Sequence, residues 1–595
     1  MNPDGTPQEL NASQQRAADH AGGHLLIVAG PGTGKTHTLT HRIARLCRQL
    51  QVGQKALAIT FTHKAAEELQ ERLTKYFSAA KKKVFVGTFH SFCLSYLREH
   101  IQDTDLFPEG NLLAKELNIA TDHDLERLAA TLWPDEPKRQ LKKRLHAVLQ
   151  QKTRGGVTPD VRVYNEILKA NAFVDYDDLL LETGKLLSRT AATEFTHVFV
   201  DEYQDINALQ HTLLKEFVRL GAVLTTIGDP HQAIYSFRGA DVSFFEHFVD
   251  DFPGATVLSL SDNYRSAPNL LKASGQIVAR ETPLVSAVTA DIYREGRLTV
   301  YDAPTDKAEA EYVVHQIEKL VGGTSMFSQD SGRVAATALA QRSFKDIAVL
   351  YRLNAQKNVL EEALGRHGIP YQTSDDRPFA ELAPVPELVA LLKDLRGAGT
   401  LSDSMEKLPR TSAGEKIFSD SRPALRKNVE RFVRMAKRFN HVQEFLDYLI
   451  LQQPEDAIER RAENVHLLTL HAAKGLEFPV VFIVGCEQNL LPLSIENMIS
   501  DPEEERRLFY VGMTRAKEAL LLTHARRRRL FGQLMSNPPS PYLNDIAREL
   551  KEYDQPRPMP QRKLKPESSQ LELFNQERIN LDARCSGRSK IPQAG

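Results

Sequence analysis

A glycine-rich segment near the N-terminus has the residue types needed to hold phosphate groups. It reads Ala29-Gly30-Pro31-Gly32-Thr33-Gly34-Lys35-Thr36 and stands between an apolar run, Leu25–Ala29, and a helix-compatible sequence. Gly32 and Gly34 allow the backbone to turn its N–H groups toward an anion. Lys35 can reach the β- and γ-phosphates, and the Thr36 hydroxyl can ligate Mg²⁺. Ala29 replaces the first glycine of the general pattern, but the position between a strand and a helix predicts a P-loop that binds ATP.

Two adjacent carboxylates follow another apolar run farther along the chain. The run His197–Val200 leads directly into Asp201 and Glu202. A strand that delivers two carboxylates to its end is typical of a Walker B site, where Asp201 would hold Mg²⁺ and Glu202 would orient and deprotonate water. A strand that ends in an acidic surface turn has the same pattern. The glycine-rich segment favours phosphoryl transfer over that alternative.

The glycine-rich segment and the two carboxylates must be positioned by secondary structure, and short apolar runs alternate here with helical patterns. The runs are too short for helices and end in polar or glycine-rich residues, which is typical of buried parallel strands. Ligands bind at the carboxyl ends of such strands, so we expect all the chemically active residues there. The first set is Leu25–Ala29, Ala56–Phe61, Val84–Val86, His197–Val200 and Val223–Ile227. A second α/β domain is predicted from Val257–Leu260, Leu298–Tyr301, Ile347–Tyr351, Val465–Leu470, Val480–Val484 and Ala519–Thr523.

The composition limits the class of protein. A chain of 595 residues predicts several domains, and its formal net charge of −1 means that any nucleic-acid surface must come from local clustering of basic residues. No apolar run is long enough to span a bilayer, and Met1–Glu9 lacks the apolar core of a signal peptide. The four cysteines are scattered and form no metal-binding pair, so we expect a reduced, cytoplasmic protein: Cys47, Cys93, Cys486 and Cys585.

Further polar and aromatic motifs follow the predicted strands in a fixed order. They are Leu10-Asn11-x-x-Gln14, Thr60–Ala66, Gly87–Phe92, Asp201–Asp205, Ile227–Ala240, Asn263–Ser266, Leu470–Phe478 and Tyr510–Ala516. Together with the glycine-rich segment, they resemble the Q motif and the successive motifs of superfamily 1A helicases, the UvrD/Rep/PcrA group. The resemblance extends from Leu10 to about Asn544.

The resemblance implies an α/β fold of two RecA-like P-loop NTPase lobes with ATP between them, each interrupted by a helical insertion. We expect the first lobe over residues 1–90 and 175–258, with its insertion over 91–174. The second lobe is expected over 259–381 and 463–547, with an insertion over 382–462 that is shorter than such proteins usually carry. Residues 548–595 are rich in Pro, Gln, Lys and Glu and are predicted to be a disordered tail.

The resemblance also implies roles around the nucleotide. Gln14 would read the adenine edge, and Tyr264 would stack on the adenine. Arg265 and Arg515 would reach the γ-phosphate from the second lobe, so that hydrolysis depends on closure of the lobes. The implied catalytic residues are Lys35, Glu202, Gln232, Arg265 and Arg515. The implied nucleotide-binding residues are Gln14, Gly32, Thr33, Gly34, Lys35, Thr36, Arg238, Tyr264, Arg265, Glu477 and Arg515, with Thr36 and Asp201 as metal ligands.

Aromatic residues are predicted to hold a single strand, because bases stack on aromatic side chains while cations bind the backbone. The resemblance assigns this role to Phe61, His90, Tyr235, Phe237, His471 and Phe531. A tryptophan often stands in place of Phe237, so stacking there is expected to be weaker. Phe531 follows Arg526–Arg529, a cationic run suited to phosphates. The choice of DNA over RNA comes from the resemblance alone.

These features predict an ATP-dependent 3′-to-5′ DNA helicase or translocase. It would act on single-stranded DNA and at junctions of single- and double-stranded DNA, in repair or replication, in association with the nucleoid. The short second insertion leaves an alternative open, a translocase that strips bound proteins from single strands with weak duplex unwinding. A non-catalytic repair scaffold is disfavoured because every catalytic position is occupied, and no C-terminal acidic cluster indicates a fused nuclease.

The predicted tail contains one short motif. Gln570-Leu571-Glu572-Leu573-Phe574 resembles the peptide with which bacterial proteins bind the β sliding clamp. Leu573 and Phe574 would enter an apolar pocket, and Gln570, followed by Leu571, would hydrogen-bond at its edge. A short helix that packs on the second lobe is the alternative. The segment Gly322–Ser328 lengthens a connection in the second lobe, and no function is assigned to it.

Overall fold

A computed structural model describes most of the chain. The described residues are 9–77, 80–104, 117–279, 288–289, 296–322, 342–373, 377–395, 399–459, 462–495 and 498–554. The sliding-clamp-like motif Gln570–Phe574 lies outside them, as does all of Gly322–Ser328 except Gly322. None of the described helices is long and apolar enough to cross a membrane.

Residues 25–260 contain a six-stranded parallel sheet in the order β3-β2-β6-β7-β1-β8. Its strands are β1 Leu25–Ala29, β2 Lys55–Thr60, β3 Val84–Thr88, β6 Phe195–Val200, β7 Val223–Gly228 and β8 Thr256–Leu260. The sheet confirms the first set of predicted strands. β8, however, pairs with β1 at the edge of this sheet, so the expectation that Val257–Leu260 belongs to the second domain is wrong.

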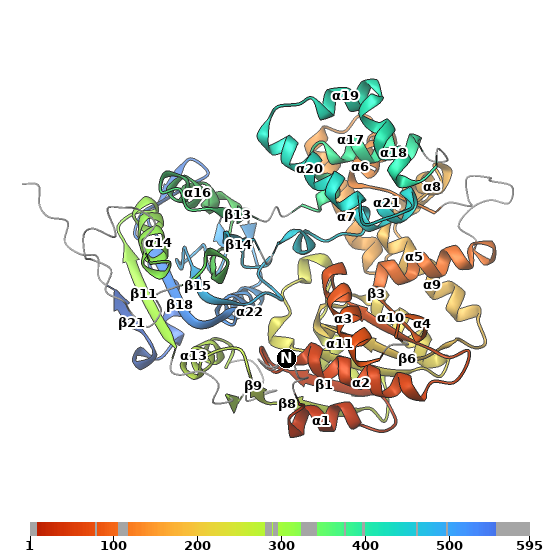
Figure 1. Cartoon of the computed structure of the whole chain (residues 1–595), viewed down its shortest axis with the longest axis horizontal. Coiled ribbons are helices and arrows are strands. Elements are labelled where there is room, and N and C mark those ends of the chain that lie inside the picture. Colours follow the sequence, from red (N-terminus) through yellow and green to blue (C-terminus); the bar gives the residue numbers. More distant parts are fainter. Residues whose placement is uncertain are drawn as a thin grey trace, which may run out of the picture. The chain divides into compact units, whose positions relative to one another are not determined.

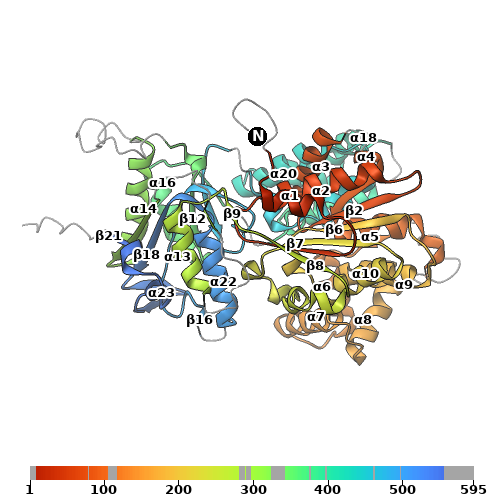
Figure 2. The same ribbon diagram turned by 90° about the horizontal axis from the view of Figure 1, so that it is seen from below.

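Helices cover both faces of this first sheet because alternate strand residues point to opposite sides. Leu25 and Ile27 pack in one apolar cluster with α2 and α3, while Leu26 and Val28 pack in another with α5, α9 and α10. Figure 2 shows α2 and α3 on one side of the strands and α10 on the other. The helices are α1 Ala12–Asp19, α2 Lys35–Gln49, α3 His63–Tyr76, α4 Ala80–Lys83, α5 Phe89–Glu99, α9 Tyr176–Arg189, α10 Ala208–Arg219, α11 Ser243–Glu246 and α12 Phe248–Asp251.

The second sheet has seven parallel strands in the order β13-β14-β12-β15-β18-β11-β21. They are β11 Arg297–Ala303, β12 Ile347–Tyr351, β13 Tyr371–Thr373, β14 Val465–Thr469, β15 Phe478–Ile483, β18 Ala516–Ala525 and β21 Glu552–Asp554. The two edge strands, β13 and β21, are short and were not predicted. β21 lies within residues 548–595, so the expected start of the disordered tail at residue 548 is wrong. Helices flank the sheet: α13 Pro268–Val278, α14 Asp306–Leu320, α16 Lys357–Arg366, α22 Pro502–Met513 and α23 Tyr542–Asp545.

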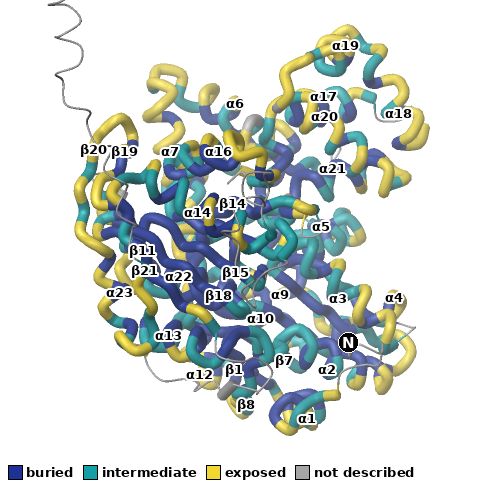
Figure 3. The backbone as a smooth tube through the Cα atoms, turned by 60° about the vertical axis from the view of Figure 1, so that its left-hand side comes forward, coloured by how far each residue is buried: buried dark blue, intermediate teal, exposed yellow. Residues whose placement is uncertain are grey.

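Two helical groups interrupt the sheets, and each has an apolar cluster of its own (Figure 1). The first group is α6 Asp122–Leu132, α7 Lys138–Thr153 and α8 Pro159–Ala170, with the paired strands β4 Asn118–Ile119 and β5 Phe173–Val174. The second is α17 Val385–Asp394, α18 Leu401–Lys407, α19 Ser412–Phe418, α20 Pro423–Ala436 and α21 Val442–Ile450. Burial is deepest along the strands of the sheets (Figure 3). The predicted α/β class with parallel sheets is confirmed.

Candidate nucleotide site and strand-binding face

The glycine-rich segment forms a tight loop between β1 and α2. Gly32 and Gly34 have φ angles of 71° and 80°, in the left-handed region that favours glycine. A Cβ on Gly32 would lie 2.6 Å from the Cβ of Arg265, and one on Gly34 would lie 2.6 Å from Nε2 of Gln14. Only glycine therefore fits these positions. The loop leaves backbone N–H groups at the start of α2, where a phosphate is favoured.

Hydrogen bonds from neighbouring segments hold the loop in shape. The Thr33 hydroxyl donates to the carbonyl oxygen of Gly30 at 2.8 Å, and Gln14 Nε2 donates to the carbonyl oxygen of Thr33 at 2.9 Å. Tyr264 donates its backbone N–H to the carbonyl oxygen of Gly32 at 2.8 Å. The motif residue Gln14 thus braces the P-loop. Its contact with adenine stays a prediction.

The two predicted Walker B carboxylates are buried at the end of β6. Burial and the neighbouring Glu202 raise the pKa of Asp201 to about 7. Burial acts in the same direction on Glu202, but Lys35 and Lys474 overcome it and lower the pKa of Glu202 to about 2. Gln204 Nε2 also donates to Glu202 Oε2 at 2.6 Å. Glu202 is therefore ionised and oriented, as a general base requires.

The chemistry of Asp201 and Thr36 fits a nucleotide-bound Mg²⁺. Both residues line the same pocket, and the raised pKa of Asp201 means that its buried negative charge lacks full compensation. No group of three or more His, Cys, Asp or Glu side chains that could hold a metal occurs within the described ranges. A cation here would therefore share its ligands with phosphate oxygens, as Mg²⁺ commonly does.

Arg515 approaches this site from the second sheet, where it directly precedes β18. Its side chain is 1% exposed, and it donates to the carbonyl oxygens of Val511 at 2.9 Å and Leu476 at 3.1 Å. It also donates to Oε1 of Gln232 at 3.2 Å. Burial and the neighbouring Arg265 lower the pKa of Arg515 to about 9. Since no carboxylate forms an ion pair with it in the described part of the chain, Arg515 is a buried cation suited to an anionic ligand.

Two ion pairs lie beside Arg515. Arg265 Nε contacts Glu477 Oε2 at 2.7 Å, and Lys517 contacts the other oxygen of Glu477 at 2.8 Å. Lys474 reaches across to the first sheet, where its ammonium contacts Asp205 at 2.6 Å and donates to the carbonyl oxygen of Gln232 at 2.6 Å. Sequence reasoning missed Lys474, although it lies within the recognised motif Leu470–Phe478.

The two sheets present opposite ends of their strands to this site. Lys35 and Asp201 follow β1 and β6, at carboxyl ends, as predicted. Glu477 and Arg515 instead precede β15 and β18, at amino ends, so the expectation that all active residues lie at carboxyl ends is wrong for the second sheet. Arg265 lies on the segment that connects β8 of the first sheet to α13, which flanks the second sheet, and the next residue, Ser266, donates its hydroxyl to the carbonyl oxygen of Ala516 at 2.7 Å.

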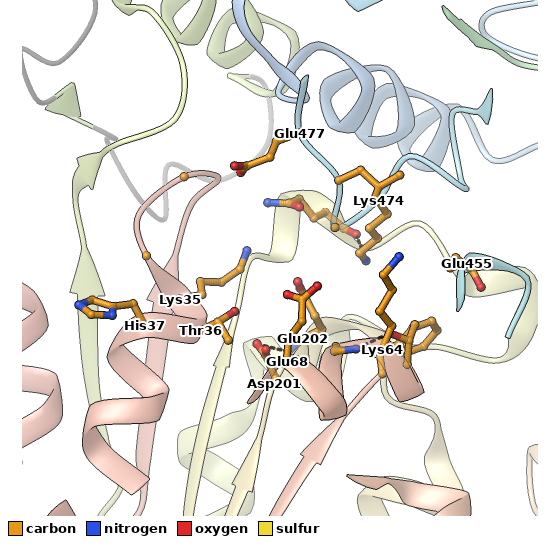
Figure 4. Close-up of a pocket in the computed structure, with 18 of the residues that line it drawn as sticks. Lys35, Thr36, His37, Lys64, Glu68, Asp201, Glu202, Glu455, Lys474 and Glu477 are labelled. Atoms are coloured by element: carbon orange, nitrogen blue, oxygen red, sulfur yellow. Dashed lines mark hydrogen bonds between the residues drawn. The ribbon is translucent and has the colours of Figure 1, made fainter. Parts of the chain in front are cut away.

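These residues surround one pocket of about 730 Å³ (Figure 4). Of the predicted nucleotide-binding residues, those that line it are Gly32, Gly34, Lys35, Thr36, Tyr264, Arg265, Glu477 and Arg515, together with the predicted residues Asp201, Glu202 and Gln232. Arg238 is not among its lining residues and lies instead over the ring of Tyr235, 4.8 Å from its centroid. The pocket also contains residues that were not predicted, among them Lys64, Glu455 and Lys474.

Family models match this arrangement over most of the chain. The UvrD/REP helicase N-terminal domain matches residues 10–253, and the UvrD-like helicase C-terminal domain matches residues 258–398 and 399–527. The chain belongs to the UvrD/REP helicase family. Similar curated proteins include the "ATP-dependent DNA helicase PcrA" of Bacillus subtilis, 29% identical over 94% of this chain and 89% of the relative. That of Staphylococcus epidermidis is 30% identical over 91% and 87%.

Family membership confirms the predicted relation to the UvrD/Rep/PcrA group and makes the protein a helicase that hydrolyses ATP. The pocket between the P-loop and Arg515 is the one described site with the groups that this hydrolysis needs. The roles of single residues in it stay predictions, because the family match identifies no individual ligand.

The predicted strand-binding aromatics of this UvrD/REP helicase differ in exposure. Phe237 is 54% exposed, whereas Tyr235 is 2% exposed and stacks on Phe61 with ring centroids 4.9 Å apart. His471 meets the edge of Phe237 at 5.5 Å, and burial together with Arg352 lowers the pKa of His471 to about 3. Only Phe237 of the pair Tyr235 and Phe237 therefore offers an open face to a base.

A second, smaller cavity of about 120 Å³ shares Phe61, Tyr235 and the carboxylates Asp201, Glu202 and Asp205 with the nucleotide pocket. His90 lines it, and burial together with His63 lowers the pKa of His90 to about 4, so that its ring is neutral at pH 7. Arg238 and Gln453 line the same cavity. The smaller cavity thus brings the predicted strand-binding residue His90 close to the Walker B carboxylates.

Phe531 lies at the tip of a hairpin formed by β19 Arg528–Leu530 and β20 Gln533–Met535, and it is 62% exposed. The arginine run before it is not a single cationic surface, which corrects the expectation from sequence. Arg528 is buried between Glu309 and Glu487 at 2.5 and 2.7 Å, and Arg526 pairs with Asp302 at 2.5 Å. Within the run Arg526–Arg529, Arg527 and Arg529 are the two arginines that are exposed and form no ion pair with a described residue.

Proposed function

We propose that this helicase uses ATP and Mg²⁺ to move along single-stranded DNA in the 3′-to-5′ direction and to separate duplex at junctions, in DNA repair or replication. The observation that carries the proposal is Arg515, a buried cation that has no carboxylate partner among the described residues and lines the same pocket as the ionised Glu202. The similar proteins of Bacillus subtilis and Staphylococcus epidermidis are named ATP-dependent DNA helicases, which supports DNA as the substrate.

The residues divide the work of hydrolysis between the two sheets. Lys35 and the backbone of the P-loop hold the phosphates, and Glu202 takes the proton of the attacking water. Thr36 and Asp201 would hold Mg²⁺, which neutralises charge on the phosphate oxygens. Arg515 and Arg265 stabilise the charge that develops on the transferred group. Because Arg515 belongs to the second sheet, hydrolysis depends on the position of one sheet against the other, and this dependence can drive steps along a strand.

The alternative is a translocase that strips bound proteins from single strands and unwinds duplex weakly. The compact second insertion, residues 382–462, supports it, since a smaller subdomain offers less surface to duplex. Strand displacement on duplexes with a 3′ or a 5′ single-stranded tail tests both. The proposal expects displacement of the 3′-tailed duplex only. The alternative expects little displacement of either, with rapid release of streptavidin from a biotinylated single strand.

We also propose that Gln570–Phe574 binds the β sliding clamp. A tail that presents Leu573 and Phe574 would bind modestly, since ordering it costs entropy, yet it would keep the motor near replicating DNA. The test is binding of a peptide of residues 566–577 to the clamp of the host, compared with the same peptide carrying Leu573→Ala and Phe574→Ala. Equal binding by both peptides, or none by either, would remove the idea.

A further inference from the structure

A short acidic turn lies against the predicted strand-binding face. This turn, η10 Pro454–Ala457, is on the segment that returns from α21 of the second insertion to β14. Asp456 Oδ1 accepts the backbone N–H of Lys64, at the start of α3, at 2.9 Å. Glu455 Oε1 accepts the hydroxyl of Tyr235 at 3.2 Å and contacts Arg238 at 3.4 Å. In Figure 4 Glu455 lies beyond Lys64, away from Lys35 and the P-loop.

The two carboxylates occupy positions that suit the phosphates of a nucleic-acid strand. The first turn of α3 has backbone N–H groups without partners inside the helix, and it is the positive end of the helix dipole. The Thr62 side chain accepts the N–H of Ala65, and Asp456 accepts that of Lys64. The guanidinium of Arg238 lies beside the exposed ring of Phe237 and could bind a phosphate through two N–H groups, but it forms an ion pair with Glu455 instead. Because bases stack on aromatic rings while cations hold the backbone, a strand stacked on Phe237 would bring phosphates to these groups.

The contact of Glu455 is poorly satisfied. Its side chain is 10% exposed, and its contacts with Tyr235 and Arg238 are 3.2 and 3.4 Å long. Its Oε2 is buried and has no hydrogen-bond partner among the described residues. The nearby pair of Lys474 and Asp205 is closer, at 2.6 Å. A buried carboxylate oxygen without a hydrogen-bond donor costs free energy. A phosphate that is better satisfied at this position would therefore displace Glu455 readily.

We propose that Glu455 and Asp456 occupy the phosphate positions of the single strand in the strand-free protein, and that a strand must expel the turn in order to bind. The inference rests on the proposed function. Its thermodynamic consequence is that the affinity for the strand is reduced by the fraction of molecules whose turn is already released. Because α21 ends only a few residues before the turn, expulsion also changes how the second insertion is attached.

The first experiment removes the two charges without changing the size of the side chains. The double variant Glu455→Gln and Asp456→Asn is compared with the wild type by fluorescence anisotropy of a labelled deoxyoligonucleotide, without nucleotide. We expect binding roughly tenfold tighter, as for a competent state that about one molecule in ten populates. Glu459→Gln is the matched control, since Glu459 is an exposed carboxylate of the same segment. An unchanged or weaker affinity of the double variant, or an equal gain in the control, would overturn the inference.

A second experiment locks the turn in place. Lys64→Cys and Asp456→Cys place one thiol on each of two residues that now meet through the backbone N–H of Lys64 and the side chain of Asp456, and the Lys64 side chain itself points to the same segment, where it donates to the carbonyl oxygen of Ile458. The oxidised protein should lose affinity for the strand and regain it on reduction. Failure of the two thiols to bridge, or equal affinity of the bridged and reduced forms, would contradict the inference. If the wild type itself does not bind the strand, the proposed function fails instead, so that the two failures are distinguishable.

Discussion

The two parallel sheets contribute opposite chemistry to one pocket. The first presents the carboxyl ends of its strands, with the P-loop and the carboxylates Asp201 and Glu202. The second presents amino ends, where Arg515 precedes β18. The P-loop and the base Glu202 alone leave the charge that develops in the transition state without a second cation. Arg515 alone has no phosphate on which to act. If the proposed roles hold, hydrolysis requires both sheets in contact.

A second contrast lies within the second sheet. Arg515 and Arg528 are both buried, but Arg528 contacts Glu309 and Glu487, whereas Arg515 has no carboxylate partner among the described residues. A buried cation with two carboxylates is satisfied by the protein itself. One bound mainly by carbonyl and amide oxygens keeps its charge for a ligand.

Substitutions of the catalytic groups on the first sheet should have the largest effect on ATP turnover. Lys35→Ala and Glu202→Gln leave the second sheet intact but remove the phosphate cation or the base. Loss of the base alone is expected to lower turnover about 10²–10⁴-fold. Stopped-flow phosphate release in the presence of single-stranded DNA measures this. Glu202→Gln should still bind a fluorescent ATP analogue, and near-normal turnover in either variant would show that the first sheet does not supply these groups.

Replacing Arg528, the arginine that is paired with two carboxylates, should lower the stability of the fold rather than the rate of ATP hydrolysis. Arg528→Met leaves Glu309 and Glu487 buried without their cation, which is expected to lower the free energy of unfolding by about 3–5 kcal/mol. Urea denaturation followed by circular dichroism measures the loss. Arg527→Met is the control, because the Arg527 side chain is exposed, and it should change stability by less than about 0.5 kcal/mol. Equal effects of the two substitutions would show that the ion pairs of Arg528 contribute nothing.

The smallest effect is expected for substitutions on the strand-binding face, where the Phe237 side chain is exposed and the Tyr235 side chain is buried. Phe237→Ala should weaken single-strand binding by about 1–3 kcal/mol, the usual contribution of one stacked base. Anisotropy of a labelled oligonucleotide measures it, with Val249→Ala, a change at another exposed apolar residue of the first lobe, as the control. Tyr235→Phe keeps the ring and should bind no more weakly than the wild type. Unchanged affinity of Phe237→Ala would remove this residue from the strand path.

Local patterns predicted the P-loop, the Walker B pair and most strands, because each is set by residues close in sequence. They failed where the deciding contact is distant. Nothing in Val257–Leu260 tells which sheet the strand joins, since its partner is β1. The burial of Arg528 depends on Glu309, 219 residues away. Likewise the pairing of Lys474 with Asp205, 269 residues apart, exists only once the two sheets meet.

The central claim is that an arginine of the second sheet completes the site of the first. The most direct test is ATP turnover as single-stranded DNA is added, measured side by side for the wild type and Arg515→Ala, with the affinity for a fluorescent ATP analogue measured on both. We predict strong stimulation of the wild type, a loss of about 10³-fold in stimulated turnover for Arg515→Ala, and similar nucleotide affinity for the two proteins. A variant whose stimulated turnover falls less than about tenfold would contradict the account.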